Sequence, residues 1–148
     1  MGVDTSMAGR VYPPGPAYQV GREKLVEFAT AVGATDRVHH DPAAARARGY
    51  ADVVAPPTFA VVLAQRSERQ YIADPAAGID YSRVVHGEEK FVHHRPIVAG
   101  DELVTTLHVD SIRQAGGHSM ITTRVEITDA AGAAVTSVSS TIVVRGEG

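Results

Sequence analysis

The chain has 148 residues, of which 44% are hydrophobic and 21% charged, so its composition is that of a globular protein and excludes wholesale disorder or a collagen-like structure. Its formal net charge of -3 provides no basic surface for nucleic acid or an anionic membrane. It contains no cysteine, which excludes disulfides, thiolate metal sites and a cysteine nucleophile and is typical of a cytoplasmic protein. We expect residues 1–148 to form one domain.

The sequence carries no signal of membrane insertion. The first ten residues lack the basic start and apolar run of a signal peptide. The longest aliphatic or aromatic run, Phe59 to Ala64, is far shorter than the ~20 residues that cross a bilayer. We therefore expect no membrane span.

Helical patterns occupy the first half of the chain. Apolar residues spaced i, i+3, i+4 and i+7 predict an amphipathic helix from Arg22 to Val32, which Gly33 ends. A second, short helix is predicted after Asp41, because an Asp cap followed by Pro42 is a typical helix start and Gly49 follows the last turn. The apolar positions of the first helix are Leu25, Phe28, Ala29 and Val32.

A third helix is predicted from Pro57 to Gln70. Its first half, Phe59 to Ala64, is apolar on nearly every face, whereas its second half, Gln65 to Gln70, is polar. A helix that is apolar all round must be enclosed by other structure. We expect a sheet to enclose the first half and the polar end to emerge from it.

The periodicity changes to two in the second half, which is typical of half-buried strands. Glycine- and proline-containing turns separate the strand patterns, and the short connections predict an antiparallel meander. Wrapped around the apolar helix, such a sheet is an α+β hot-dog fold. The predicted strands are Ser82 to His94, Leu103 to Val109, Ile121 to Thr128 and Val135 to Val144, with turns at Pro96 to Asp101, Gly116-Gly117 and Ala130 to Gly132.

The seven histidines do not form a metal-binding pattern. His93 and His94 are adjacent in a predicted strand and point to opposite faces, and no HxxxH or HExxH spacing is present. There is also no Gly-x-Ser-x-Gly elbow and no glycine-rich phosphate loop. We predict neither a metal nor a cofactor.

The loops before the third helix concentrate titratable residues. Gly33 to Pro42 is rich in His and Asp, and Val53 to Phe59 leads into the helix through Pro56-Pro57. Helix-start N–H groups stabilise negative charge on oxygen, and a histidine moves protons near neutral pH. The same composition is also common in solvated helix entries, where it serves turn formation.

In these segments the chain resembles the (R)-specific enoyl hydratase and MaoC-like dehydratase superfamily, in particular its actinobacterial branch of small FAS1-like subunits. The resemblance covers nearly the whole chain and implies a hot-dog fold, dimerisation, and an acyl chain carried on coenzyme A or acyl carrier protein as ligand. It rests on Tyr12-Pro-Pro, Val32-Gly33, Asp41-Pro42, Val54-Ala-Pro-Pro-Thr-Phe59, Asp80-Tyr-Ser-Arg-Val-Val-His-Gly-Glu88 and Arg95-Pro-Ile-Val-Ala-Gly-Asp101.

The hydratase motif of that superfamily, Asp-x-Asn-Pro-(Leu/Ile/Val)-His, is incomplete here. His39 fills the histidine position, but Ala34 stands in place of the catalytic Asp, and a methyl group cannot transfer a proton. Asp36, two positions on, is the remaining candidate for that role. A glycine whose N–H holds the thioester carbonyl aligns with Pro57, which has no N–H, so the N–H of Thr58 is the candidate oxyanion donor.

The resemblance also implies residues that contact the acyl thioester. Phe59 and Val62 are core residues first and line an acyl chain only where the core is incomplete. Residues 80–88 either line an acyl tunnel or begin a strand in which Gly87 permits close approach of a helix. The full implied set is Asp41, Pro57, Phe59, Val62, Tyr81, His86 and Gly87.

These observations predict a (3R)-3-hydroxyacyl-thioester dehydratase or hydratase subunit, either weakly catalytic or the acyl-binding member of a dimer. The dimer is formed with a second copy or with a hot-dog chain that holds an intact motif, since an open sheet leaves edges that need cover. A non-catalytic scaffold subunit is the alternative from another class. A hot-dog thioesterase ranks lower, because the carboxylate it needs, Glu68, falls on the polar end of the third helix.

Overall fold

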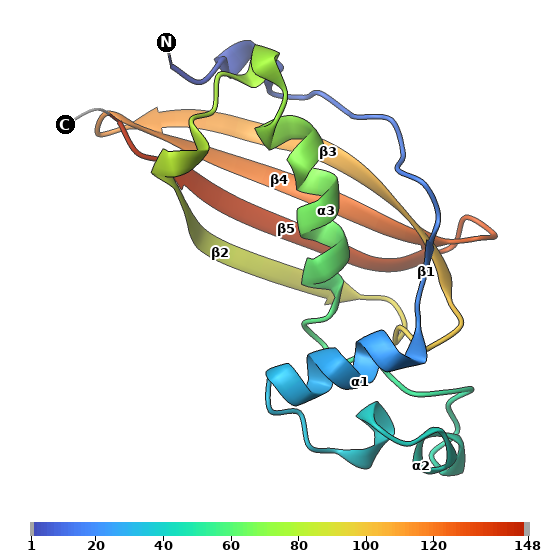
Figure 1. Ribbon diagram of the computed structural model, residues 1–148. Coiled ribbons are helices and arrows are strands. Elements are labelled where there is room, and N and C mark those ends of the chain that lie inside the picture. The colour runs from blue at the N-terminus through green and yellow to red at the C-terminus, as the bar shows by residue number, and fades with distance from the viewer. Residues whose placement is uncertain (1, 147–148) are drawn as a thin grey trace.

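In the computed structural model, which describes residues 2–146, one curled antiparallel sheet wraps around a helix, α3 (Figure 1). The strand order is β1-β3-β4-β5-β2. This arrangement confirms the predicted α+β hot-dog fold. The strands are β1 (Tyr18–Gln19), β2 (Val84–His93), β3 (Glu102–Ala115), β4 (His118–Asp129) and β5 (Ala134–Val144).

The predicted four-stranded meander is wrong for one strand. Strands β3, β4 and β5 do follow one another as hairpins, and the first turn uses Gly116 and Gly117 at positive φ, +58° and +80°. Strand β2, however, pairs with β5 rather than with β3, and the two-residue β1 pairs with β3. The alternation of polar and apolar residues along a strand defines which face is buried but not which strand pairs with it. The sequence pattern therefore cannot predict that β2 crosses over to pair with β5.

Three α-helices occupy the positions that the sequence predicts, with small shifts. Helix α1 spans Arg22–Ala31 and α2 spans Pro42–Ala47, where the Asp41 carboxylate accepts the N–H of Ala43 at 2.9 Å. Helix α3 spans Ala60–Ile72 instead of starting at Pro57. The preceding residues form a turn in which the N–H of Phe59 donates to the Pro56 carbonyl at 2.9 Å.

The polar end of α3 emerges from the sheet on one face only, where Gln65, Arg66 and Arg69 are exposed. Glu68 is only 2% exposed and Tyr71 is fully buried, because one face of the helix stays covered along its whole length. This face recurs every three to four residues, which is the helical period. Its members are Ala60, Leu63, Ala64, Ser67, Glu68 and Tyr71.

A second, smaller apolar cluster lies beyond the amino end of α3, among α2 and its neighbouring loops (Figure 1). It consists of Val38, Ala45 and Val54, with Tyr50 and Val98 packed against it. The N–H of Val54 donates to the Val38 carbonyl at 2.9 Å and ties the two loops together. This cluster supports the histidine-rich loop. No helix within residues 2–146 is long and apolar enough to span a bilayer.

Candidate functional site

His39 ends a short 3-10 turn, Arg37–His39, whose start is capped by Asp36. The His39 ring is fixed because its Nδ1 lies 2.7 Å from the Val54 carbonyl oxygen. A carbonyl only accepts, so Nδ1 carries the hydrogen in the neutral ring and Nε2 is left as a proton acceptor. The loop therefore holds His39 in the tautomer that a general base requires.

The His39 ring borders an open pocket of about 470 Å³, which we call the His39 pocket. Pro57 lines this pocket from the approach to α3, and Tyr50 lines it from the loop after α2. The end of β2 contributes His93 and His94, which the sequence did not assign to any site. The end of a strand carries no local signal of the loop that it will face. The segment after β2 is held against the loop before α3 by the Val54–Val98 bridge and by the Ala55 N–H, which donates to the Ile97 carbonyl at 2.8 Å.

Asp36 also lines the His39 pocket, but its carboxylate is already engaged. It accepts the N–H of Val38 at 3.1 Å and both oxygens pair with Arg48, at 2.9 and 3.0 Å. The Val38 N–H and the Arg48 guanidinium hold the pKa of Asp36 below its usual range. At neutral pH Asp36 is thus an ionised carboxylate that would have to leave Arg48 to exchange protons beside His39.

Neither of the other motif positions supplies a proton-transfer group. Ala34 presents a methyl side chain, and its carbonyl binds Nε2 of His40 at 2.6 Å. Thr58 lies in the exposed turn before α3, one residue after Pro57. The predicted oxyanion donor is therefore a turn N–H that precedes the first residue of the helix.

Several residues implied for acyl binding have structural roles. Asp41 caps α2 and pairs with Arg37 at 2.7 Å. Phe59 is fully buried and packs edge-on against Phe28, with ring centroids 5.4 Å apart. Val62 is half-buried against the core. None of these three is among the residues that line the His39 pocket within the described part of the chain.

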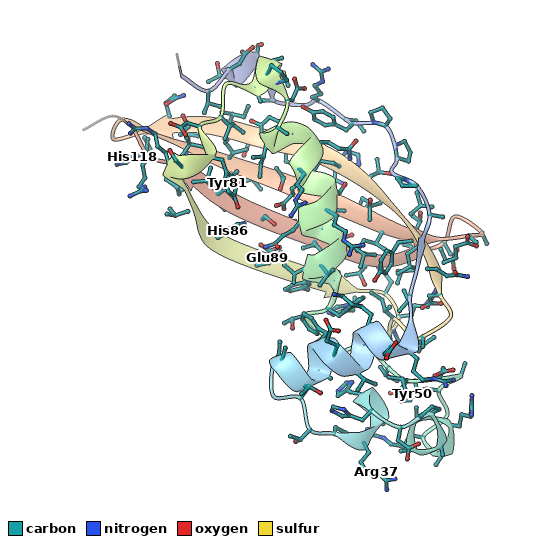
Figure 2. The ribbon with its side chains drawn as sticks, in the orientation of Figure 1. Arg37, Tyr50, Tyr81, His86, Glu89 and His118 are labelled. Atoms are coloured by element: carbon teal, nitrogen blue, oxygen red, sulfur yellow. The ribbon has the colours of Figure 1, made fainter. Side chains whose placement is uncertain are left out.

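Tyr81 and His86 lie away from the His39 pocket, along the carboxyl-terminal half of α3 (Figure 2). With Glu68 and Arg69 they line a separate cavity of about 420 Å³, which we call the β2–α3 cavity. Gly87 sits beside it at the register shift between His86 and Glu88. The structure thus places Asp36, His39 and Pro57 at one cavity and Tyr81 and His86 at the other, and the remaining predicted site residues line neither.

Strand β2 links the two cavities, because His86 near its start faces one and His93 at its end faces the other. At about 3.3 Å per residue, these seven steps span roughly 23 Å. Sequence reasoning missed Glu68 as a cavity residue, although the helical period from Ala60 through Ala64 to Glu68 was a signal for it. Tyr81 and His86, on the other side of this cavity, were already among the residues that the family resemblance implied.

The comparisons with known proteins match this geometry. Residues 6–138 match the family model "FAS1-like, dehydratase domain region". A UPF0336 protein of Saccharopolyspora erythraea is 53% identical over 146 residues, which is 99% of this chain and 94% of that protein. A solved MaoC-like dehydratase superposes with a TM-score of 0.88 at 38% identity and covers 95% of this chain, whereas this chain spans 43% of that protein's length.

A further solved structure is the C-terminally truncated HadBC (3R-hydroxyacyl-ACP dehydratase) complex from Mycobacterium tuberculosis. It is 30% identical, with a TM-score of 0.84, over 97% of this chain and 99% of the matched one. From these matches and the curled sheet around α3, the chain belongs to the FAS1-like dehydratase-domain family of MaoC-like hot-dog proteins.

Proposed function

We propose that this chain is the acyl-binding subunit of a (3R)-3-hydroxyacyl-thioester dehydratase, whose substrate is carried on coenzyme A or acyl carrier protein. The observation that carries the proposal is that the Asp/His motif is only half present in this chain. His39 is oriented as a base, but position 34 holds Ala and Asp36 is paired with Arg48. A chain with half of the acid–base machinery is best explained if a second subunit supplies the rest.

The reaction needs two proton movements. The proton on C2 is removed, the C2–C3 double bond forms as the C3–O bond breaks, and the hydroxyl leaves as water after gaining a proton. The loss of one proton-transfer group typically lowers a rate by ~10²–10⁴. His39 alone therefore supports at most slow turnover, and a carboxylate–histidine pair from a partner would carry the full reaction.

The relatives support a two-subunit arrangement. The matched structure named above is a HadBC complex, and the matched MaoC-like dehydratase is more than twice as long as the segment that this chain covers. Both are consistent with two hot-dog units acting together. We propose the same for this chain, with a hot-dog partner that holds an intact Asp/His motif.

One observation favours a second candidate, a hot-dog acyl thioesterase. Glu68 is not on an exposed helix end but lines the β2–α3 cavity beside His86. A carboxylate at a cavity is what activation of water on a thioester requires. This candidate ranks second, because no observation connects that cavity with a bound thioester.

The test is the hydration of crotonyl-coenzyme A by this chain alone, by a hot-dog chain with an intact motif alone, and by their mixture. We expect the mixture to exceed this chain alone by at least ~10²-fold. His39→Ala should abolish any slow activity of this chain alone, whereas His118→Ala, at the distant β3–β4 hairpin, should not. Full activity of this chain alone would refute the acyl-binding role, and release of free thiol without hydration would favour the thioesterase.

A further inference from the structure

The segment just before β1, residues 13–17, runs along the edge of β3, and we call it the proline strap (Figure 1). Ahead of it, the N–H of Tyr12 donates to the Leu107 carbonyl at 2.9 Å. Three residues of the strap are prolines, which have no N–H, so the strap is joined to β3 through the N–H of Gly15, which donates to the Thr105 carbonyl at 3.1 Å. Because proline fixes its own φ, the strap is a stiff wall that does not pair along its length.

A cavity of about 430 Å³ lies between the proline strap, Tyr18 and α3, and we call it the strap cavity. Its helix side is formed by Leu63, Arg66, Ser67 and Gln70, which are spaced i, i+3, i+4 and i+7 and therefore share one face of α3. The volume lies within the range of small-molecule sites, about 300–1,000 Å³. Among the described residues, none that lines the strap cavity also lines the His39 pocket or the β2–α3 cavity.

The cation of the strap cavity is Arg66, whose Cζ lies 5.0 Å from the centre of the Tyr18 ring. Attraction to the face of the ring orients the guanidinium and leaves the N–H groups at its edge able to donate. Arg66 is exposed, and none of the ion pairs found in residues 2–146 includes it. A guanidinium that is held in place without a carboxylate is suited to an anionic ligand.

The other polar groups of the strap cavity are hydrogen-bond donors as well. Ser67 is 4% exposed, and its hydroxyl accepts Nε2 of Gln70 at 3.4 Å but donates to no acceptor in the described part of the chain. A Cβ at Gly15 would lie 3.5 Å from Oγ1 of Thr105, so this hydroxyl faces the strap. The remaining lining residues are apolar or aromatic. The cavity therefore suits a ligand with an apolar body and an oxygen that accepts hydrogen bonds.

The two cavities beside α3 differ in charge. In the β2–α3 cavity, Glu68 and Arg69 provide one acid and one base. In the strap cavity, Arg66 is the base, and the described lining residues include no Asp or Glu. One cation matches one negative charge, and the planar fork of a guanidinium matches the two oxygens of a carboxylate. A monocarboxylate is thus the anion that fits this cavity.

We infer that the strap cavity binds a small carboxylate with an apolar body, with the carboxylate against Arg66 and the body between the proline strap and Leu63. The inference goes beyond the proposed function, because it concerns a second ligand at a site that contains none of the residues assigned to the dehydratase reaction. The bound carboxylate bridges the strap and α3. Because it binds only where these two elements are assembled, it stabilises the folded chain.

Calorimetric titration with octanoate at pH 7.5 tests the site, with octan-1-ol as the uncharged comparison. We expect one octanoate per chain, bound at least about tenfold more tightly than octanol. Arg66→Gln should weaken octanoate binding at least about tenfold, whereas Arg69→Gln, which removes an exposed arginine from the other side of α3, should leave it unchanged. The inference is overturned by an absence of saturable octanoate binding, by equal affinity for octanoate and octanol, or by equal octanoate affinity of the two variants.

Hydrogen exchange of the unmodified chain locates the ligand without any substitution. Octanoate should slow exchange at the amides of Tyr12 and Gly15, which hold the proline strap to β3, and leave the amides of β2 unchanged. It should also raise the melting temperature increasingly with its concentration. Slower exchange along β2 with no change in the strap would place the carboxylate elsewhere and overturn the inference.

Discussion

Tyr71 lies on the buried face of α3, and within residues 2–146 its hydroxyl is the buried side-chain polar atom that has no hydrogen-bond partner. Burial raises the pKa of Tyr71 to about 12. The neighbouring Tyr12, whose ring centroid lies 6.3 Å away, instead donates its hydroxyl to Asp74 at 2.8 Å. The two tyrosines share a core region but differ in hydrogen bonding.

We therefore predict opposite effects of removing the two hydroxyls. Tyr71→Phe should raise the free energy of unfolding by about 1 kcal/mol, because an unsatisfied buried polar group is lost, whereas Tyr12→Phe should lower it by about as much. Urea denaturation of both variants measures the difference. Equal destabilisation by the two substitutions would show that the Tyr71 hydroxyl is satisfied by water.

Asp52 shows how one ion pair ties α1 to the loop before α3. Arg22 donates to both of its oxygens at 2.8 and 3.0 Å, and the Val53 N–H donates at 2.7 Å. These contacts, with the Arg22 hydrogen bond foremost, lower the pKa of Asp52 to about 2. Because the folded-state pKa lies below the usual 3.8, the contribution to stability is present above pH 4 and is lost as pH falls through 2.

Accordingly, Asp52→Asn should lower the free energy of unfolding by about 1 kcal/mol at pH 7, a modest amount because Arg22 is half-exposed. The difference from the unmodified chain should shrink between pH 4 and pH 2. Urea denaturation at several pH values measures it, with the exposed Glu27→Gln as control. A difference that persists unchanged at pH 2 would argue against an ionic origin.

Helix α3 packs into the centre of the core, because its buried face contacts β3, β4 and β5. Leu63 is 2% exposed near the middle of this face, whereas Val61 is only half-buried. Leu63→Ala should cost about 3 kcal/mol of the free energy of unfolding, and Val61→Ala clearly less. Thermal and urea denaturation of the pair measure this. Equal costs would mean that the helix does not present this face to the sheet.

The predicted and observed ends of the helices and strands show how well local sequence patterns predict secondary structure. The period of 3.6 and the caps place α1 and α2 within a residue of their observed ends. The alternation finds all four long strands, although β3 continues to Ala115, beyond the predicted end at Val109. The same reasoning started α3 three residues too early and misjudged Glu68, because it divided the helix by composition along its length. The spacing of apolar residues around the helix axis would have placed Glu68 on the buried face.

For the molecule as a whole, the two edges of the sheet are unequal. The β1 edge is a two-residue strand, whereas the β2 edge is ten residues long. In the isolated chain, native-state hydrogen exchange should be slowest in β4, which is paired on both sides, and faster in β2. Amides of β2 as slow as those of β4 in the isolated chain would contradict an open edge.

The candidate site was only partly predictable. His39 and the break in its motif are local features, and the sequence placed them next to the buried helix. His93 and His94 line the same pocket because the segment after β2 pairs with the loop before α3, and Asp36 is paired with Arg48, which follows it by twelve residues. Local patterns do not encode which distant side chains will meet.

By itself, the sequence determined the helices and the four long strands, because each depends on residue spacing within a short segment. The incomplete Asp/His motif was recognised through the family resemblance, which also supported the hot-dog class. The tertiary structure alone decided that β2 forms the long edge of the sheet, that Glu68 lines a cavity with His86, and that the predicted site residues do not meet in one place. Which strands become neighbours depends on how the whole chain buries its apolar residues. This burial brings together residues that are far apart in the sequence, which no local pattern can predict.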